Sequence, residues 1–451
     1  NRHKANIQAM LASAYLSQGD TTLAEKHVHT AAAIAAKYIT EPSMSEPLSS
    51  VCDLYASLEA GKKNYAAAKG FYRQSLSFTL KENKVFRRRE TGKILNNIGN
   101  ICEAAGEIDS AISYYHKALY TVTDVDPDNI YSLPSSENVY AENTIMESLD
   151  NIAGCMSAHA TPNEINWLTH AVSCYNISMQ TERKLMLAFT YDESKYRMLQ
   201  DSRKRSEYAI NICYKLYEQT HTNEWAVAAY QFAEKNKAFV LLESVKRNLA
   251  ASYLQNDTLY LQMQQQQSAY ALAEKAVAEA QIQKDSALII YRNRQLKAFG
   301  EALQKAKAAF EYNNSAYRQL MEKDDDTAVA KTAALITDQH TALIEYFYGD
   351  SSCYGFQFLY GNSITMFKQV STIENDIDSF LLFFKNKNAI TESPVAFNAA
   401  AYKLYQSLQL QFISKETSSL IIIPDGPISF IPFDALISTP SAGIEPGTYH
   451  Y

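Results

Sequence analysis

An internal repeat limits what this chain of 451 residues can fold into more than any other feature does. Its clearest copy runs from Leu95 to Ala118, with apolar residues at helical spacing on both sides of Gly106. Gly99 is a small residue at a position where two helices would approach each other closely. One such pair of helices cannot bury its apolar stripe alone, so the sequence predicts a stack of helix pairs.

The same pattern recurs along the first half of the chain. Equivalent positions, Ala31, Ser75 and Ala118, lie 44 and 43 residues apart. Looser copies follow over residues 149–178 and 208–249. The pattern resembles the tetratricopeptide (TPR) consensus, whose period is about 34 residues. The excess implies longer helices or loops, and we expect a longer turn at residues 61–63 of the second copy.

The TPR resemblance implies that residues 1–250 form an α-α superhelix whose first helices line a concave groove for a protein or peptide partner. In the clearest copy the exposed stripe of that helix is predicted to be Lys93, Asn96, Asn100 and Glu103. Asparagine amides can hydrogen-bond an extended peptide backbone, and Lys93 can pair with a carboxylate. The alternative is a helix face that is merely solvated.

Residues 251–330 are predicted to form a connector of two long antiparallel helices. Between Asp257 and Lys323 apolar residues recur at helical spacing, and Gly300 is the only glycine or proline. The helices are expected to break near Asp285, which would cap the second helix. A turn at residues 324–326 would end the hairpin.

From Thr341 onward the pattern changes to that of strands. The segment contains apolar runs that predict strands, two helical stretches, and a further apolar strand of the kind buried on both faces of a parallel sheet. These elements are the strands 342–348, 353–360 and 363–367, the helices 375–385 and 395–410, and the strand 419–423.

The last strand runs into a turn, Pro424-Asp425-Gly426, followed by Pro432-Phe433. Gly426 is expected to adopt a positive φ, and Asp425 to bind backbone amides of its turn. Pro432 suits the first turn of a helix. We therefore interpret these residues as structural rather than catalytic.

Residues 420–436 resemble the signature of the CHAT family, caspase-like domains that are joined to TPR arrays, and residues 345–351 resemble the start of such domains. The resemblance implies that residues 331–451 are the amino-terminal part of an α/β caspase-like domain. It also implies a cysteine endopeptidase with a His–Cys pair, both located after this motif. No residue of this chain matches either member, so we predict no catalytic residue and no peptidase activity for the chain itself.

The six cysteines are widely spaced, and they form no CxxC pair. Cys353 follows His340 in the strand region, but packing in the sheet is the favoured interpretation over a Cys353–His340 dyad. A catalytic thiol needs a lowered pKa and an oriented base. No metal-binding motif and no cofactor fingerprint is present, so neither a metal nor a cofactor is predicted.

Charge and hydropathy argue against two classes of partner. The formal net charge is -7, and the basic runs 87–89 and 203–205 adjoin acidic residues, so we expect solvated helix faces and no nucleic-acid partner. No apolar stretch approaches the roughly 20 residues that span a bilayer. A cytoplasmic location is expected, and export stays open because a segment could have been removed upstream of Asn1.

Two functions fit these features. The first is the partner-binding and regulatory part of a CHAT-type, caspase-like cysteine endopeptidase. The second is a non-catalytic TPR scaffold or adaptor with a degenerate caspase-like domain. In both functions, the activity expected of the residues in this chain is binding to a protein or peptide partner.

Overall fold

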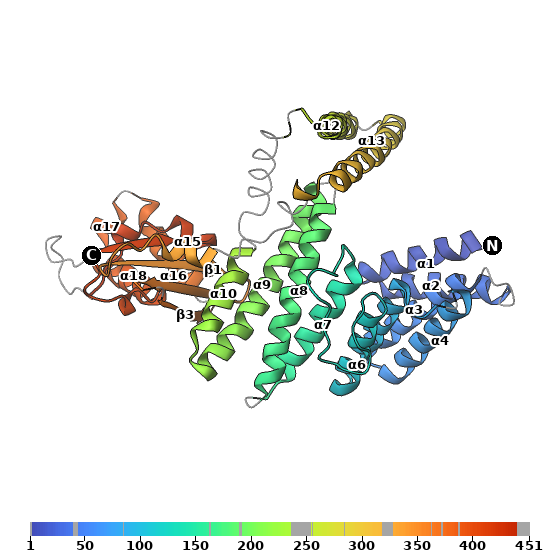
Figure 1. The fold of residues 1–451 in the computed structure, drawn as a ribbon, viewed down its shortest axis with the longest axis horizontal. Helices are drawn as coiled ribbons and strands as arrows, with labels where there is room; N and C mark the ends of the chain where they lie inside the picture. The colour runs from blue at the N-terminus through green and yellow to red at the C-terminus, as the bar shows by residue number, and fades with distance from the viewer. Residues whose placement is uncertain are drawn as a thin grey trace. The chain divides into compact units, whose positions relative to one another are not determined.

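The protein is mainly α-helical and carries one small mixed sheet near its carboxyl end, as the sequence predicts (Figure 1). The computed structural model divides into two compact units, residues 1–185 and 186–451, called here the N-terminal and C-terminal units. It describes residues 2–38, 44–83, 85–161, 164–188, 192–235, 254, 256–283, 285–317, 328–361, 363–370, 373–386 and 388–439.

The N-terminal unit consists of consecutive helix pairs that pack side by side (Figure 1). The pairs are α1 (Arg2–Ser17) with α2 (Thr21–Ala36), α3 (Ser45–Gly61) with α4 (Tyr65–Asn83), α5 (Arg89–Ala104) with α6 (Ile108–Tyr120), and α7 (Asn143–His159) with α8 (Ile165–Ala188). First helices also contact one another, α1 with α3 and α5 with α7.

The turns inside the first three pairs are equally long, so the longer turn expected in the second pair is wrong. Gly19 and Gly106 adopt a positive φ at equivalent places in the first and third turns. Lys63 takes the same left-handed conformation in the second, with φ 60°. A residue with a side chain is less stable in this conformation than glycine by roughly 1–2 kcal/mol, but the second turn nevertheless keeps the length of the other two.

Gly99 lets the two helices of the third pair approach closely, as the sequence predicts. A Cβ atom added to Gly99 would lie 2.4 Å from Cε1 of Tyr115, which is fully buried. The aromatic ring of α6 therefore fills the space that the missing side chain leaves on α5.

The C-terminal unit contains the predicted helical hairpin, formed by α12 (Thr258–Gln283) and α13 (Ser286–Asn313). Asp285 caps α13 as expected, because its Oδ1 accepts hydrogen bonds from the amides of Ala287 and Leu288, both at 3.0 Å. The contact between the helices is apolar. It involves Tyr260, Met263, Tyr270, Leu303, Ala306 and Phe310. The turn predicted at residues 324–326 lies outside the described residues.

The sheet follows the predicted strands closely. It comprises β1 (Thr341–Tyr348), β2 (Ser352–Leu359), β3 (Ser363–Val370) and β4 (Ser419–Ile423), in the order β3-β2-β1-β4. The first three strands form an antiparallel meander, and β4 pairs with β1 in parallel. Between β3 and β4 lie α16 (Ile373–Leu381), α17 (Ala389–Glu392) and α18 (Pro394–Ser407), with short 3-10 turns.

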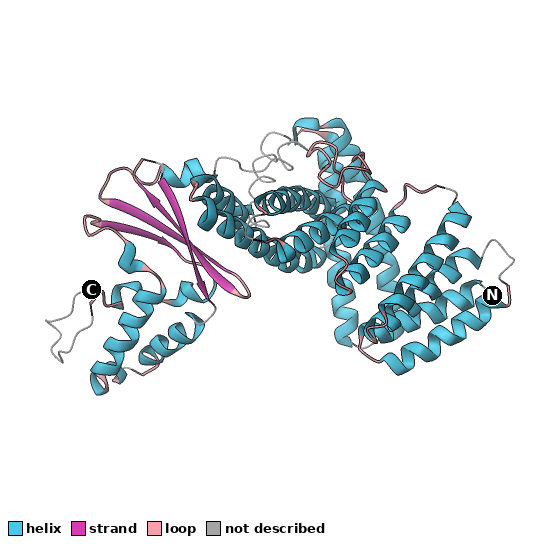
Figure 2. Cartoon of the chain, turned by 90° about the horizontal axis from the view of Figure 1, so that it is seen from below, coloured by secondary structure: helices cyan, strands magenta, loops and turns pink. Residues whose placement is uncertain are grey.

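Helices cover both faces of this sheet (Figure 2). On one face Ile344, Tyr346 and Cys353 pack with residues of α16 and α18. The other face meets α9 (Asp192–Thr220) and α10 (Asn223–Lys235). Tyr230 of α10, for example, contacts the ring of Phe358 with centroids 4.8 Å apart. A smaller helix, α15 (Ala328–Ala333), lies beside α10.

The helix pair α9/α10, which the sequence assigned to a repeat array over residues 1–250, lies in the same compact unit as the sheet. One expectation differs from this arrangement: the strand β4 is not buried on both faces, since its first two residues are exposed and the other three are half-buried. Its partner among the described residues is β1 alone, so one edge has no covering strand there.

Candidate functional site

Among the described residues of the C-terminal unit, one stripe of α9 makes an extensive set of polar contacts. Arg203, Glu207, Asn211 and Tyr214, called here the α9 stripe, follow one another at spacings of four, four and three residues. Such spacing places side chains on one face of a helix. That face is turned toward the sheet, where each of the four contacts a strand or a strand end.

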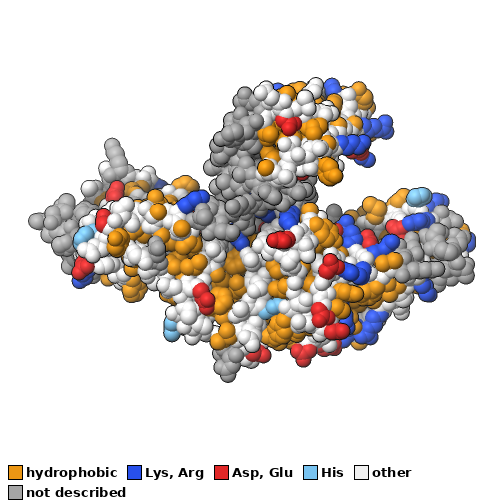
Figure 3. Space-filling model, in the orientation of Figure 1, with side chains coloured by type: hydrophobic (Ala, Val, Ile, Leu, Met, Phe, Trp, Pro, Cys, Tyr) orange, Lys and Arg blue, Asp and Glu red, His pale blue; other side chains and the backbone are white. Residues whose placement is uncertain are grey.

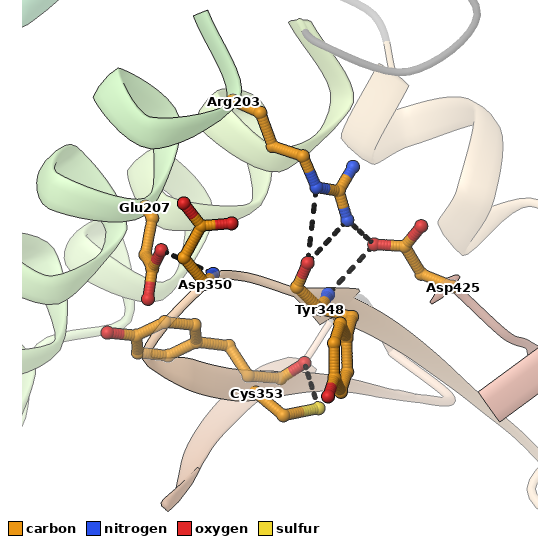
Figure 4. Close-up of polar contacts among 7 residues, drawn as sticks. Arg203, Glu207, Tyr348, Asp350, Cys353 and Asp425 are labelled. Carbon is orange, nitrogen blue, oxygen red and sulfur yellow. Dashed lines mark hydrogen bonds and ion pairs between the residues drawn. The ribbon is translucent and has the colours of Figure 1, made fainter. Parts of the chain in front are cut away.

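Arg203 binds the end of β1 and the turn that follows β4 (Figure 4). Its guanidinium donates to the carbonyl oxygen of Tyr348, at 3.2 Å from Nε and 2.5 Å from Nη2. Nη2 also pairs with the carboxylate of Asp425, and the guanidinium carbon lies 4.8 Å from the ring centroid of Phe347. One side chain thus holds two strand ends.

Asp425, the partner of Arg203, also binds the end of β1 directly. Its Oδ2 accepts a hydrogen bond from the backbone amide of Tyr348 at 2.8 Å. The sequence predicts that Asp425 binds amides of its own turn, but the amide belongs to β1. Because β1 and β4 are parallel neighbours, their carboxyl ends meet at one sheet edge, and this brings the two segments together.

Glu207 caps the turn between β1 and β2. Its carboxylate accepts hydrogen bonds from the amides of Asp350, Ser351 and Ser352 at 2.7, 2.9 and 2.9 Å, and from the hydroxyl of Ser351 at 2.6 Å. A Cβ on Gly349 would lie 2.4 Å from the Glu207 carboxyl carbon, so glycine is required for this approach. Consecutive amides that converge on an anion form a concave binding site.

Asn211 and Tyr214 extend the contact to β2 and β3. The Oδ1 atom of Asn211 accepts from the Tyr354 hydroxyl at 3.2 Å and from the Lys368 ammonium at 2.7 Å. The rings of Tyr214 and Tyr354 meet edge to face. Burial lowers the pKa of Lys368, and the charge of Lys215 lowers it further. The α9 stripe therefore reaches across β1, β2 and β3.

The remaining residues of the predicted motif lie in turns or in the core near this edge of the sheet. Gly426 has a φ of +57°, as expected, and Pro424 is exposed. Pro432 directly precedes a single 3-10 turn, Phe433–Ala435, instead of lying inside a longer helix. Phe433 packs against the core beneath the sheet.

Cys353 lies in the core, and its geometry excludes a dyad with His340. The thiol is 1% exposed, and burial raises its pKa to about 12, with a further contribution from Asp425. Cys353 pairs with Tyr348 at one end of β1, whereas His340 precedes the first residue of that strand. Eight residues of strand separate the two by roughly 20 Å or more.

The predicted partner-binding stripe of the N-terminal unit is only partly available to a partner. Lys93 and Asn100 are exposed, and Glu103 is half-buried. Asn96 is 0% exposed and accepts a hydrogen bond from the Ser148 hydroxyl of α7 at 3.1 Å, so the prediction of an exposed Asn96 is wrong. The reason is the next helix pair, whose first helix packs over this part of α5.

The sequence interpretation missed Arg203 and Glu207, and it treated residues 203–205 as a solvated face. Arg205 is in fact buried, like Glu207. Positions 203, 207 and 211 recur every four residues, so the sequence does place these polar side chains on one helix face. Such a face is ordinarily solvated, and nothing near it in the chain indicates that a sheet covers it.

The surface charges of the described residues are mixed. In the face shown in Figure 3, Lys and Arg side chains are interspersed with Asp and Glu side chains. In the basic run 87–89, Arg87 pairs with Asp124 at 2.7 Å and Arg89 lies 3.7 Å from Glu142. Within the described residues, no helix is both long enough and apolar enough to cross a membrane.

Comparisons with known proteins add little. No family model matches the chain, and no curated protein matches it. Among solved structures, BtubC (BKLC) from P. vanneervenii is similar over 51% of this chain and 77% of its own, with 15% sequence identity and a TM-score of 0.35. A similarity this distant carries no argument about function.

Proposed function

We propose that this chain is the partner-binding and regulatory part of a caspase-like cysteine endopeptidase of the CHAT type. The repeats of residues 1–250 resemble TPRs, and residues 420–436 resemble the CHAT signature. The observation that carries the proposal is the α9 stripe, which ties α9, a helix that the sequence assigns to the repeat array, to the carboxyl ends of β1 and β4. The partner is a protein or peptide, and no cofactor takes part.

The position of Arg203 explains how such regulation would work. In open α/β sheets, sites gather beyond the carboxyl ends of parallel strands. Arg203 pairs with Asp425 and also donates to Tyr348 at this edge, so a shift of α9 would break both contacts together. A partner that changes the position of α9 would thereby change the conformation of the edge.

The protein expressed from its complete reading frame tests the peptidase role. We expect it to cleave peptides through a cysteine other than Cys353. Arg203→Ala should change the cleavage rate about 5-fold or more, because hydrogen bonds of a charged group, worth about 1.5–3 kcal/mol, are lost at the sheet edge. Lys204→Ala, an exposed neighbour on α9, should leave the rate unchanged. A folded protein without hydrolysis would refute the peptidase role, and equal rates in the two variants would refute the role of Arg203.

The partner-binding role has its own test. If Lys93 and Asn100 contact a partner captured by the chain, the double variant Lys93→Ala/Asn100→Ala should weaken binding about 10-fold, as expected for two lost polar contacts. Lys117→Ala, an exposed residue of α6, is the matched control. Asn96→Ala should instead lower the melting temperature. Unchanged affinity in the folded double variant would show that the partner binds elsewhere.

A non-catalytic scaffold is the second candidate, and the cysteines favour it. All six are free and buried. Burial raises the pKa of Cys353 to about 12, so its thiol is a poor nucleophile. Binding is therefore the activity that the residues of this chain support. Free, buried thiols also fit the reducing cytoplasm, where we propose that the protein acts.

A further inference from the structure

One group of side chains in the N-terminal unit has the composition of a metal site. Glu103 stands in the last turn of α5, and Cys155 and His159 stand four residues apart on α7. One ligand atom from each of the three lies within 4.8 Å of the others. The Nε2 atom of His159 is 3.8 Å from Oε1 of Glu103. Two neighbouring helix pairs thus bring a carboxylate, a thiol and an imidazole together.

The distances allow a tetrahedral ion after small movements. Zinc bonds of about 2.3 Å to sulfur and about 2.0–2.1 Å to nitrogen or oxygen place ligand atoms roughly 3.3–3.6 Å apart. His159 is the last residue of α7, and its side chain is 41% exposed, so the surrounding protein does not enclose its ring. Cys155 is buried, which fixes its position.

A second contact orients the carboxylate. The Tyr115 hydroxyl lies 2.7 Å from Oε2 of Glu103 and 2.9 Å from Oδ1 of Asn100, and its single proton is donated to one of them at a time. With Oε2 engaged by Tyr115, Oε1 is the carboxylate oxygen that faces His159. Ligands of metal ions are commonly held in this way by hydrogen bonds from outside the coordination sphere.

The chemistry of the three side chains indicates which kind of ion they would bind. A coordinated thiol is deprotonated, so Cys155 would bind as a thiolate. A thiolate, an imidazole and a carboxylate together suit Zn²⁺ better than the hard ions Mg²⁺ or Ca²⁺.

We propose that Glu103, Cys155 and His159 bind one Zn²⁺ ion that joins α5 to α7. The fourth coordination position is open to water or to a side chain of a partner, as in other zinc sites with three protein ligands. The ion would fix the packing of the third helix pair against the fourth. The sequence predicted no metal because Cys155 and His159 form no CxxC-type motif, and Glu103 lies 52 residues before Cys155.

The full chain, without a polyhistidine tag, should bind one equivalent of Zn²⁺ in a calorimetric titration and should melt at a higher temperature with the ion. Because coordinating side chains dominate affinity, His159→Ala should weaken binding by at least about 10-fold. His29→Ala, which removes another exposed helical histidine, should leave the affinity unchanged. No measurable binding, or equal affinity in the two variants, would overturn the proposal.

Cobalt tests the role of the thiol directly. Co²⁺ substituted for Zn²⁺ should give a thiolate-to-cobalt charge-transfer band, and Cys155→Ser should abolish it. Cys102→Ser, which changes a buried thiol of α5 outside the group, should keep the band. If Cys155→Ser does not fold, Glu103→Gln should still reduce the affinity for Zn²⁺. A band that survives in Cys155→Ser, or an affinity unaffected by Glu103→Gln, would contradict the assignment.

Discussion

Replacing Gly99 by leucine is expected to lower the free energy of unfolding of the N-terminal unit by about 3 kcal/mol, the upper end of the usual cost of overpacking. The first added atom would already stand 2.4 and 2.5 Å from two carbons of the Tyr115 ring. That ring is fully buried, and its hydroxyl is held near Asn100 and Glu103. The ring cannot move aside, so α5 and α6 must separate.

Chemical denaturation followed by circular dichroism measures this effect. Gly99→Ala should be destabilising as well, but less so than Gly99→Leu, because it adds only the clashing Cβ. Gly70→Ala in α4 is the matched control, since a Cβ there meets nothing within 4 Å and should stabilise the helix by about 0.5–1 kcal/mol. A Gly99→Leu protein with the transition of the unchanged chain would show that the assigned packing of α5 on α6 is wrong.

Local sequence patterns were sufficient to predict most of the fold. Helical periodicity and Gly106 located the third helix pair, and Asp285 correctly marked the start of α13. The strands β1 to β4 follow apolar runs whose ends are marked by turn residues. These features depend on neighbours a few residues apart, which a sequence displays directly.

Contacts between distant segments were beyond the sequence. Asn96 is buried because α7 packs over it, and nothing near Asn96 in the chain indicates this. Arg203 and Asp425 are 222 residues apart, and they meet because β4 lies beside β1. The prediction that β4 is buried on both faces was wrong for the same reason. A short apolar run looks alike in sequence whether the strand lies at the edge of a sheet or inside it.

Glu207 offers the second large effect, in the C-terminal unit. Glu207→Ala should lower the free energy of unfolding by about 2–4 kcal/mol, because three turn amides and the Ser351 hydroxyl lose a charged acceptor. Glu207 itself is 4% exposed, so water does not simply replace it. Asp350 and Ser351 are exposed, so water can partly hydrate their amides in the variant, and this limits the decrease in the free energy of unfolding.

Two further variants show which property of Glu207 stabilises the turn. One removes the charge of its side chain, and the other removes a different carboxylate of α9. Glu207→Gln keeps an oxygen where Oε1 accepts from Ser351 and Ser352, but it directs an NH₂ group at the amide of Asp350, so we expect a smaller loss than for alanine. Asp201→Ala removes an exposed carboxylate of the same helix and should change stability by less than about 0.5 kcal/mol. Hydrogen exchange at residues 350–352 should accelerate in Glu207→Ala alone. If Glu207→Ala has the same stability and the same exchange rates as Asp201→Ala, the carboxylate does not hold the turn. The α9 stripe would then be a packing surface without the polar coupling assigned to it.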